Sequence, residues 1–171
     1  MAIGKATQSD LAALYSLVND AYRGENSKLG WTTEAHLLDG LRIDSETLLS
    51  YLNNPKVILL KYTDNVSGDI IGSVYLEIRT PKLYLGMFSV SPLLQGKGVG
   101  RSLLIAAETH AHELGCTTLT ITVISTRYEL IAWYQRRGFN ATGEILPFHE
   151  DEKFGIPKNH IELIVMEKKL F

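Results

Sequence analysis

Gln95-Gly96-Lys97-Gly98-Val99-Gly100 is the stretch of sequence that decides the fold and points to a ligand. A β-forming run ends near Ser91 just before it, and a predicted amphipathic helix follows it directly, with Gly115 beyond its end. The predicted buried face of this helix is made by Leu103, Leu104, Ala107, Ala111 and Leu114. Backbone N–H groups in a first helical turn have no intrahelical partner and lie at the positive end of the dipole, while glycine permits close approach. The segment therefore predicts a binding site for phosphate or pyrophosphate.

The glycine spacing separates this loop from two common nucleotide-binding loops. No glycine-lysine-Ser/Thr triplet occurs, so the GxxxxGK[ST] motif is absent. The GxGxxG motif is also absent, because Arg101, which follows Gly100, stands where its last glycine would be. Lys97 and Arg101 add positive charge beside the loop, although each is equally compatible with a solvated surface position. A glycine-rich turn that only starts a helix is the structural alternative, and the surrounding sequence has to decide between the two.

Upstream of the loop, helical patterns give way to β-strands. A helix from residue 11 to residue 22 is predicted after a capping box formed by Thr7 and Asp10. Two short helical segments are predicted next, at residues 33–41 and 46–52. Three strands of an antiparallel meander then follow, at residues 57–60, 70–78 and 83–91.

Downstream of the loop, strands and helices alternate. A strand is predicted at residues 117–124, and a helix that opens with a capping box of Thr126 and Glu129 continues to Gly138. Two further β segments, at residues 139–143 and 161–166, flank an irregular loop over residues 147–157. A helical crossover returns its strand parallel to the preceding one, so the prediction is an α+β fold with a mixed, mostly antiparallel central sheet flanked by helices.

Length and composition narrow the class of protein. The 171 residues, 45% of them hydrophobic, suit a single domain over residues 1–171. The net charge of −2, with no dense basic stripe, argues against a nucleic-acid partner. No apolar run approaches the roughly 20 residues of a membrane span, and Met1 does not open a signal peptide. Because Cys116 is the only cysteine, no intramolecular disulfide can form, and a cytoplasmic location without membrane association is expected.

The glycine segment resembles the Q/R-x-x-G-x-G/A signature of the GNAT acetyltransferase superfamily at every defined position. Residues 85–92, Leu-Gly-Met-Phe-Ser-Val-Ser-Pro, are similar to the fourth strand of that family, which ends in hydrophobic-x-Val-x-Pro. The resemblance implies a GNAT-like sheet whose bulged fourth strand splays from the next one, with coenzyme A between them. It implies that backbone groups of Phe88, Ser89 and Val90 hold the pantetheine. It also implies that the pyrophosphate is held by amides of Gln95, Gly96, Lys97, Gly98, Val99, Gly100 and Arg101.

A second motif lies some forty residues further on. Residues 129–139, Glu-Leu-Ile-Ala-Trp-Tyr-Gln-Arg-Arg-Gly-Phe, resemble the family's helix with hydrophobic-Tyr-x-x-x-Gly-Phe, and the two motifs cover residues 83–143. The resemblance implies that Tyr134 is catalytic, because a phenol near the sulfur can protonate the leaving thiolate. The structural alternative is a core tyrosine on the same helical face as Leu130 and Ile131. Arg127 stands where the family often has asparagine, which puts the asparagine's cofactor contact in doubt.

The general base and the acceptor site are less clearly marked. Glu77 and Glu34 are candidate bases, although each is more often a surface carboxylate. In the family, the segments equivalent to residues 22–42 and 144–158 shape the acceptor pocket. The first segment contains Trp31, which fits a hydrophobic staple before the next helix cap. The second contains an acidic cluster of Glu150, Asp151 and Glu152, which could face a cationic amine or simply be solvated.

Metal and thiol chemistry are not expected. None of the five histidines has ligand spacing, so no metal is predicted; they are His36, His110, His112, His149 and His160. Cys116 follows a helix and precedes an apolar strand, which favours a small core residue over a nucleophile.

Taken together, the resemblance implies an acetyl-CoA-dependent N-acetyltransferase that moves an acetyl group to a primary amine by direct attack. The acceptor can be a small molecule, a peptide or a protein, and a homodimer is possible. A non-catalytic acyl-CoA-binding or sensor module on the same fold is the first alternative. A protein-interaction domain with an incidental glycine loop is the second.

Overall fold

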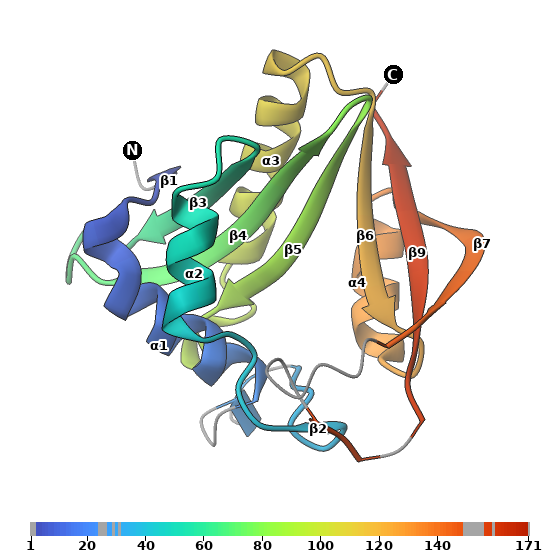
Figure 1. Cartoon of the computed structure of the whole chain (residues 1–171), viewed down its shortest axis with the longest axis horizontal. Helices are drawn as coiled ribbons and strands as arrows, with labels where there is room; N and C mark the ends of the chain where they lie inside the picture. Colours follow the sequence, from blue (N-terminus) through green and yellow to red (C-terminus); the bar gives the residue numbers. More distant parts are fainter. Residues whose placement is uncertain are drawn as a thin grey trace.

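A seven-stranded sheet forms the centre of the molecule, in the order β1-β3-β4-β5-β6-β9-β7 (Figure 1). The structure is a computed structural model and describes residues 3–23, 27–28, 30, 32–148, 156–158 and 160–170. The strands of the central sheet are β1 (Ile3–Lys5), β3 (Val57–Thr63), β4 (Ile70–Arg79), β5 (Lys82–Val90), β6 (Thr118–Ile124), β7 (Asn140–Pro147) and β9 (Glu162–Lys169). Only β5 and β6 pair in parallel, and the other neighbours are antiparallel. The predicted mixed, mostly antiparallel sheet is therefore confirmed.

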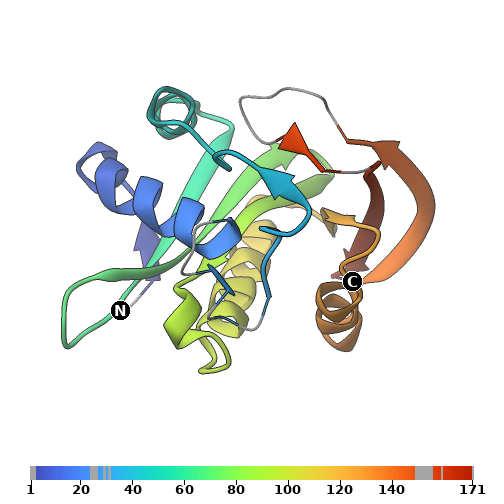
Figure 2. The same ribbon diagram turned by 90° about the horizontal axis from the view of Figure 1, so that it is seen from below.

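Helices cover both faces of the sheet (Figure 2). The first layer comprises α1 (Leu11–Tyr22) and α2 (Ser45–Leu52), which pack with Leu59, Tyr75 and Met87 in one core cluster. The second comprises α3 (Val99–Glu113) and α4 (Tyr128–Arg136), which lie on the opposite face over the larger core cluster. The predicted bounds of these four helices hold to within a few residues. The crossover through α3 returns β6 parallel to β5, as the sequence predicted.

A β-bulge divides β5 into two parts. Ser73 of β4 pairs with Ser89, but Tyr75 pairs with Gly86, so β5 carries one extra residue in this interval. Met87 lies inside the bulge with a φ of 44°, the left-handed region that side chains rarely adopt. β5 is the fourth strand in the order of the sheet, so the expected bulged fourth strand is confirmed.

Beyond its first three residues, β5 separates from β6. The parallel pairing joins Lys82, Leu83 and Tyr84 to Thr118, Leu119 and Thr120 and extends no further in the register of the two strands. Figure 1 shows the strands diverging from that end towards the lower half of the molecule. The backbone groups of β5 near Val90 that lie on the β6 side therefore pair with no strand of the sheet.

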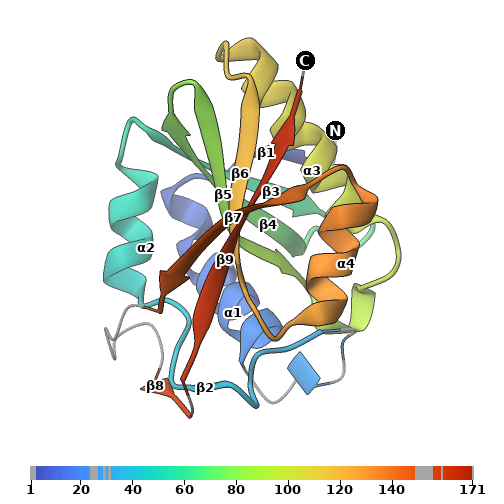
Figure 3. The same ribbon diagram turned by 90° about the vertical axis from the view of Figure 1, so that its right-hand side faces the viewer.

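The helix predicted at residues 33–41 is wrong. Glu34 O accepts the N–H groups of Leu37 and Leu38 at 2.9 and 3.1 Å, which closes a single turn, and β2 (Leu38–Asp39) follows. β2 pairs with β8 (Ile156–Pro157), inside the predicted irregular loop (Figure 3). Gly40 then takes a φ of 87°, which a continuing α-helix does not accommodate. Long-range pairing with β8 has overridden the local helical pattern.

The two predicted capping boxes had different outcomes. At the first, Thr7 N–H donates to the Asp10 carboxylate at 2.8 Å, which confirms it. At the second, Arg127 is the N-cap residue of α4 and makes no side-chain cap bond, so the expected box of Thr126 and Glu129 is wrong. Glu129 instead accepts a hydrogen bond from the Thr32 hydroxyl at 2.9 Å. Across the described residues, no helix has the length and apolar character needed to span a membrane.

Candidate active site

The glycine loop delivers a row of backbone N–H groups to the start of α3. After the 3₁₀ turn η3 (Pro92–Leu94), Gly96 and Gly98 take φ values of 82° and 87°, which only glycine adopts readily. Gly98 is the N-cap of α3, and its carbonyl accepts the first intrahelical bond, from Ser102 N–H at 3.0 Å. The N–H groups of residues 98–101 consequently have no carbonyl partner within the helix.

A cavity of about 300 Å³ opens where β5 and β6 separate. Seven of the ten predicted cofactor-binding residues line it, namely Phe88, Val90, Gln95, Gly96, Gly98, Gly100 and Arg101. Tyr134 of α4 lines the same cavity. Residues that the sequence motifs had not assigned to the cofactor complete the wall, including Ala21, Tyr22, Thr32, Arg127, Leu130, Trp133 and Arg137. The fold thus brings both sequence motifs to one cavity.

Three predicted residues direct their side chains elsewhere. Ser89 is buried and pairs with Ser73 of β4. Its hydroxyl donates a hydrogen bond to Met87 O at 2.9 Å. Val99 packs in the main core, and Lys97 is exposed outside the cavity wall. The expected contacts at these three positions were main-chain contacts, so they stay predictions.

The Gln95 side chain has a structural role that the motif alone did not indicate. Its amide donates to Val90 O at 3.3 Å, and its carbonyl accepts from Thr32 N–H at 3.4 Å. A Cβ on Gly30 would lie 2.4 Å from Gln95 Oε1, so glycine leaves room for this side chain. Gln95 therefore fixes the end of β5 against the segment that follows α1.

Tyr134 is buried inside an aromatic cluster and reaches the cavity wall. Only 6% of its surface is exposed, and its ring packs edge-on against Trp133 and Phe139 at centroid distances of 5.1 and 5.3 Å. Burial raises the pKa of its hydroxyl far above the ordinary value near 10. The phenol therefore keeps its proton at neutral pH.

Arg137 is a cavity residue that the motifs did not single out. Its guanidinium stacks on Trp133 at 3.7 Å and donates to Trp133 O at 3.0 Å, while its buried Nε has no hydrogen-bond partner. Burial lowers the pKa of Arg137, and the positive charges of Arg136 and Arg101 lower it further. A donor that is buried next to the glycine loop's arginine suits a phosphate oxygen.

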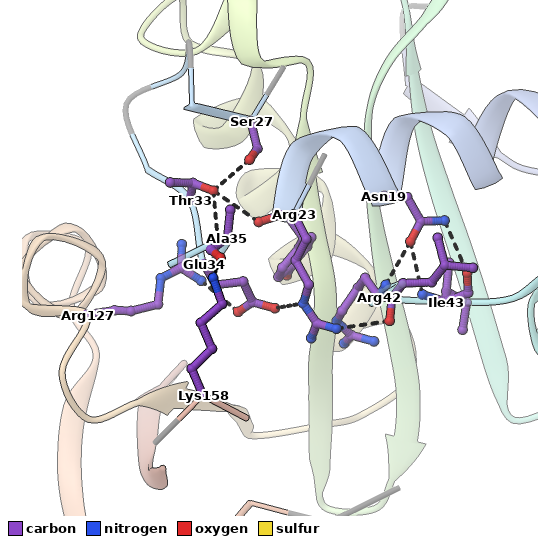
Figure 4. A network of polar contacts seen from close by, with 12 residues as sticks. Asn19, Arg23, Ser27, Thr33, Glu34, Ala35, Arg42, Ile43, Arg127 and Lys158 are labelled. Atoms are coloured by element: carbon purple, nitrogen blue, oxygen red, sulfur yellow. Dashed lines mark hydrogen bonds and ion pairs between the residues drawn. The ribbon is translucent and has the colours of Figure 1, made fainter. Parts of the chain in front are cut away.

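A buried ionic network includes the cavity residue Arg127 (Figure 4). Glu34 accepts Arg23 Nε at 2.7 Å on one oxygen and Arg127 Nη1 at 3.2 Å on the other. Arg127 Nη2 also donates to Thr32 Oγ1 at 2.7 Å. The network ties the end of α1 and the segment after it to the start of α4, which is 93 positions beyond Glu34 in the sequence.

Neither candidate general base lines the cavity. Both carboxylate oxygens of Glu34 are engaged by guanidinium groups, from Arg23 and from Arg127, so this carboxylate belongs to a buried ionic network. Glu77 belongs to the far end of the β4–β5 hairpin, where it accepts from Tyr75 Oη at 2.6 Å and pairs with Arg79. The hydrogen bond from Arg79 is the largest of the influences that lower the pKa of Glu77. These placements do not support either residue as the base.

The remaining expectations concern metal, thiol and acceptor segments. Within the residues that the structure describes, no three of His, Cys, Asp and Glu gather closely enough to hold a metal ion. Cys116 is fully buried in the main core, and burial raises its pKa, as expected for a packing residue. Trp31, His149 and the acidic cluster at residues 150–152 lie outside the described residues.

The sequence profile of the acetyltransferase (GNAT) family matches residues 11–139 of this chain. The chain therefore belongs to the GNAT acetyltransferase family, as its two motifs indicated.

Individual relatives are distant. The spermine/spermidine N(1)-acetyltransferase of Bacillus subtilis is 27% identical over 59% of this chain and 78% of its own length. A ribosomal-protein-alanine N-acetyltransferase structure from Brucella melitensis is 24% identical, with a TM-score of 0.73 over 99% of this chain and all of that one. A Salmonella typhimurium acetyltransferase solved with acetyl-CoA is 21% identical, with a TM-score of 0.71 over 99% and 93% of the two chains. These likenesses establish the fold, and the acceptors that they name differ.

Proposed function

We propose that this protein is an acetyl-CoA-dependent N-acetyltransferase that acts on a primary amine by direct attack. One observation carries the proposal: a single cavity is lined by the glycine loop, the bulged strand β5 and Tyr134. Family membership supports the reaction class. The geometry supports the direct route, because the described cavity wall contains no cysteine that could carry the acetyl group as an intermediate.

Each end of the cavity offers groups that fit a part of acetyl-CoA. The unpaired amides of residues 98–101, together with Arg101 and Arg137, suit the pyrophosphate, because a helix N-terminus and guanidinium groups both favour anions. The unused edge of β5 suits the pantetheine amides, which can pair with it like an additional strand. Gly100 leaves room in the wall that a side chain would fill, since a Cβ there would be in contact with Phe88 at 3.4 Å and Trp133 at 3.6 Å.

Tyr134 suits the departure of the thiol. The neutral amine attacks the thioester carbonyl carbon, the C–S bond breaks, and the nitrogen loses one proton while the sulfur gains one. A protonated phenol at the sulfur stabilises the developing thiolate by a hydrogen bond and supplies its proton. The aromatic packing around Tyr134 holds the hydroxyl in a fixed place, which is what such a donor requires.

The amine's proton leaves by a different route. Neither Glu34 nor Glu77 lines the cavity, so we propose that water carries this proton to solvent and that the acceptor enters as the free base. A cytoplasmic location, a homodimer and a single domain over residues 1–171 stay predictions.

Thiol release from acetyl-CoA tests the proposal. Amino acids, polyamines, aminoglycosides and peptides are offered in turn, and the acetylated product is identified by mass spectrometry. At least one amine is expected to be acetylated in a reaction that needs both protein and acetyl-CoA. If the protein binds acetyl-CoA but acetylates no amine, the non-catalytic sensor alternative replaces the enzyme.

A further inference from the structure

Two tyrosines reach the cavity from opposite faces of the sheet. Tyr22 is the last residue of α1 and Tyr134 belongs to α4, and both line the cavity. After burial, Tyr22 is the next influence that raises the pKa of Tyr134, so the two side chains lie within electrostatic range of each other. In the described part of the chain, the closed-off side-chain atoms without a hydrogen bond are Arg127 Nε and Arg137 Nε. The two tyrosine hydroxyls, which make no hydrogen bond with a described residue, are therefore open to a ligand.

The two faces of the sheet assign different partners to these hydroxyls. The glycine loop begins α3, which covers the same face as α4, whereas α1 covers the opposite face (Figure 2). A cofactor whose phosphates bind the glycine loop approaches from the α3 side, so the α1 side stays free for the acceptor. Ala21 and Tyr22 are the α1 residues of the described wall, and of these two only Tyr22 has a polar side chain.

An attacking amine needs an atom that accepts its N–H, because its lone pair has to point at the thioester carbon. The arginines and the tryptophan of the described wall only donate hydrogen bonds, so they cannot take this part.

The other oxygens on the side chains of the described wall are already engaged. Thr32 Oγ1 donates to Glu129 at 2.9 Å and accepts from Arg127 at 2.7 Å. Gln95 Oε1 accepts the Thr32 N–H at 3.4 Å. The two tyrosines therefore provide the acceptor oxygens, and Tyr134 is already assigned to the sulfur.

We infer that Tyr22 is a second catalytic residue, whose hydroxyl oxygen accepts a hydrogen bond from the acceptor amine and directs the nitrogen lone pair at the thioester carbon. The inference rests on the proposed acetyl transfer and deepens it. As the C–N bond forms, the nitrogen becomes positive, so the N–H···O bond becomes charge-assisted and strengthens in the transition state. Tyr22 keeps its own proton throughout, and the proton of the amine leaves through water.

The position of Tyr22 is fixed by contacts that do not use its hydroxyl. Its carbonyl oxygen accepts the Glu34 N–H at 3.0 Å and the Thr33 hydroxyl at 3.2 Å, and Arg42 lies over its ring at 5.2 Å. Burial raises the pKa of Tyr22, so the hydroxyl stays neutral and serves as a hydrogen-bond acceptor without acting as a base. A group held in this way orients the amine without first having to be ordered.

Tyr22→Phe tests the inference on the full chain, with the amine that shows the highest kcat/KM in the thiol-release panel. The single-turnover rate at saturating acetyl-CoA is expected to fall by about 10- to 150-fold, which corresponds to one hydrogen bond to a charged group. Acetyl-CoA affinity and Tm are expected to stay as in the parent, because the ring and the backbone contacts remain. Tyr15→Phe is the control: Tyr15 lies on the same helix and is half-buried, but it is not among the residues that line the cavity, so the parental rate is expected.

A double variant separates a direct role from support of Tyr134. An oxygen that binds the amine is needed whether or not the Tyr134 hydroxyl is present. Tyr22→Phe/Tyr134→Phe is therefore expected to be slower than Tyr134→Phe alone. Equal rates would show that Tyr22 acts only through Tyr134, and would overturn the inference.

The remaining outcomes separate this inference from the proposed function. A parental rate in Tyr22→Phe overturns the inference and leaves the acetyltransferase in place. A loss that Tyr15→Phe shares, or one that comes with weaker acetyl-CoA binding or a lowered Tm, also overturns it, because the hydroxyl would then be structural. If the parent acetylates no amine, the proposed function fails, and the inference with it.

Discussion

At the scale of single residues, Tyr134 and Gly98 carry the account of the site. Tyr134 combines a hydroxyl on the cavity wall with a packing role in the core, so the two functions have to be separated by experiment. Gly98 combines a left-handed backbone with open space around its Cα, which a ligand can occupy.

Replacing Tyr134 by phenylalanine separates its two roles. Tyr134→Phe keeps the aromatic contacts and removes the proton donor, so single-turnover acetylation is expected to slow by about 10²–10⁴-fold. Folding stability and acetyl-CoA affinity are expected to stay as in the parent. A parental single-turnover rate would assign Tyr134 to packing, and a loss of several kcal/mol in stability would assign its hydroxyl to a structural hydrogen bond.

The raised pKa of Tyr134 predicts a pH profile. A group whose pKa is raised remains protonated above its ordinary titration range, so the donor is not lost at alkaline pH. The single-turnover rate is expected to rise with pH as the acceptor amine loses its proton and to show no decline up to about pH 10. A decline centred below pH 10, in protein that remains folded, would show that the donor titrates earlier than its burial allows.

Gly98→Val tests the loop with Gly68→Val as its control. Both glycines have positive φ, 87° and 79°, and neither would meet a neighbour at a new Cβ, so both changes carry a similar strain of at least about 1–2 kcal/mol. Only Gly98 lines the cavity. Acetyl-CoA affinity is expected to fall at least tenfold in Gly98→Val and to stay unchanged in Gly68→Val, as measured by calorimetry. Equal acetyl-CoA affinities in the two variants would show that the pyrophosphate does not bind at this loop.

At the scale of elements, the start of α3 and the edge of β5 are the parts that a ligand should protect. The amides of residues 99–101 lack helical partners, so they exchange with solvent unless a ligand accepts their hydrogen bonds. Acetyl-CoA is expected to slow hydrogen exchange at residues 98–101 and 88–90, and to leave α2 unchanged. Protection that is confined to any other segment would contradict the proposed location.

The glycine loop and β5 could be predicted from the sequence, because the types of their own residues determine their conformation. The glycines at 96 and 98 take the positive φ values that their residue type permits, and the alternation along β5 places Leu83 and Leu85 in the same core cluster. The first of the two short helical segments was mispredicted at residues 33–41, because β2 forms only through pairing with β8, over a hundred residues away. A pattern within ten residues contains no information about that partner.

The charged network at the cavity was also beyond prediction from sequence. Arg23, Glu34 and Arg127 come from three separate segments, and each alone looks like an ordinary surface charge. The one signal was the departure from the family pattern at Arg127, where asparagine is common. That departure identified the position, but only the fold shows that the guanidinium is buried and reaches Glu34.

At the scale of the whole molecule, the divergence of β5 and β6 is the feature from which the site follows. The sheet provides a rigid frame, the bulge turns β5 away, and α3 and α4 each bring one end to the opening (Figure 1). Membership of the GNAT acetyltransferase family agrees with this arrangement.

Binding of acetyl-CoA to the purified protein tests the central claim most directly. A ligand that binds only the folded state stabilises it by mass action, by about 2.7 kcal/mol at a hundred times its Kd. Acetyl-CoA at millimolar concentration is therefore expected to raise the Tm by several degrees, with a heat of binding in calorimetry that fits one site per chain. Absence of both the Tm shift and the heat of binding would contradict the claim that this cavity is an acetyl-CoA site.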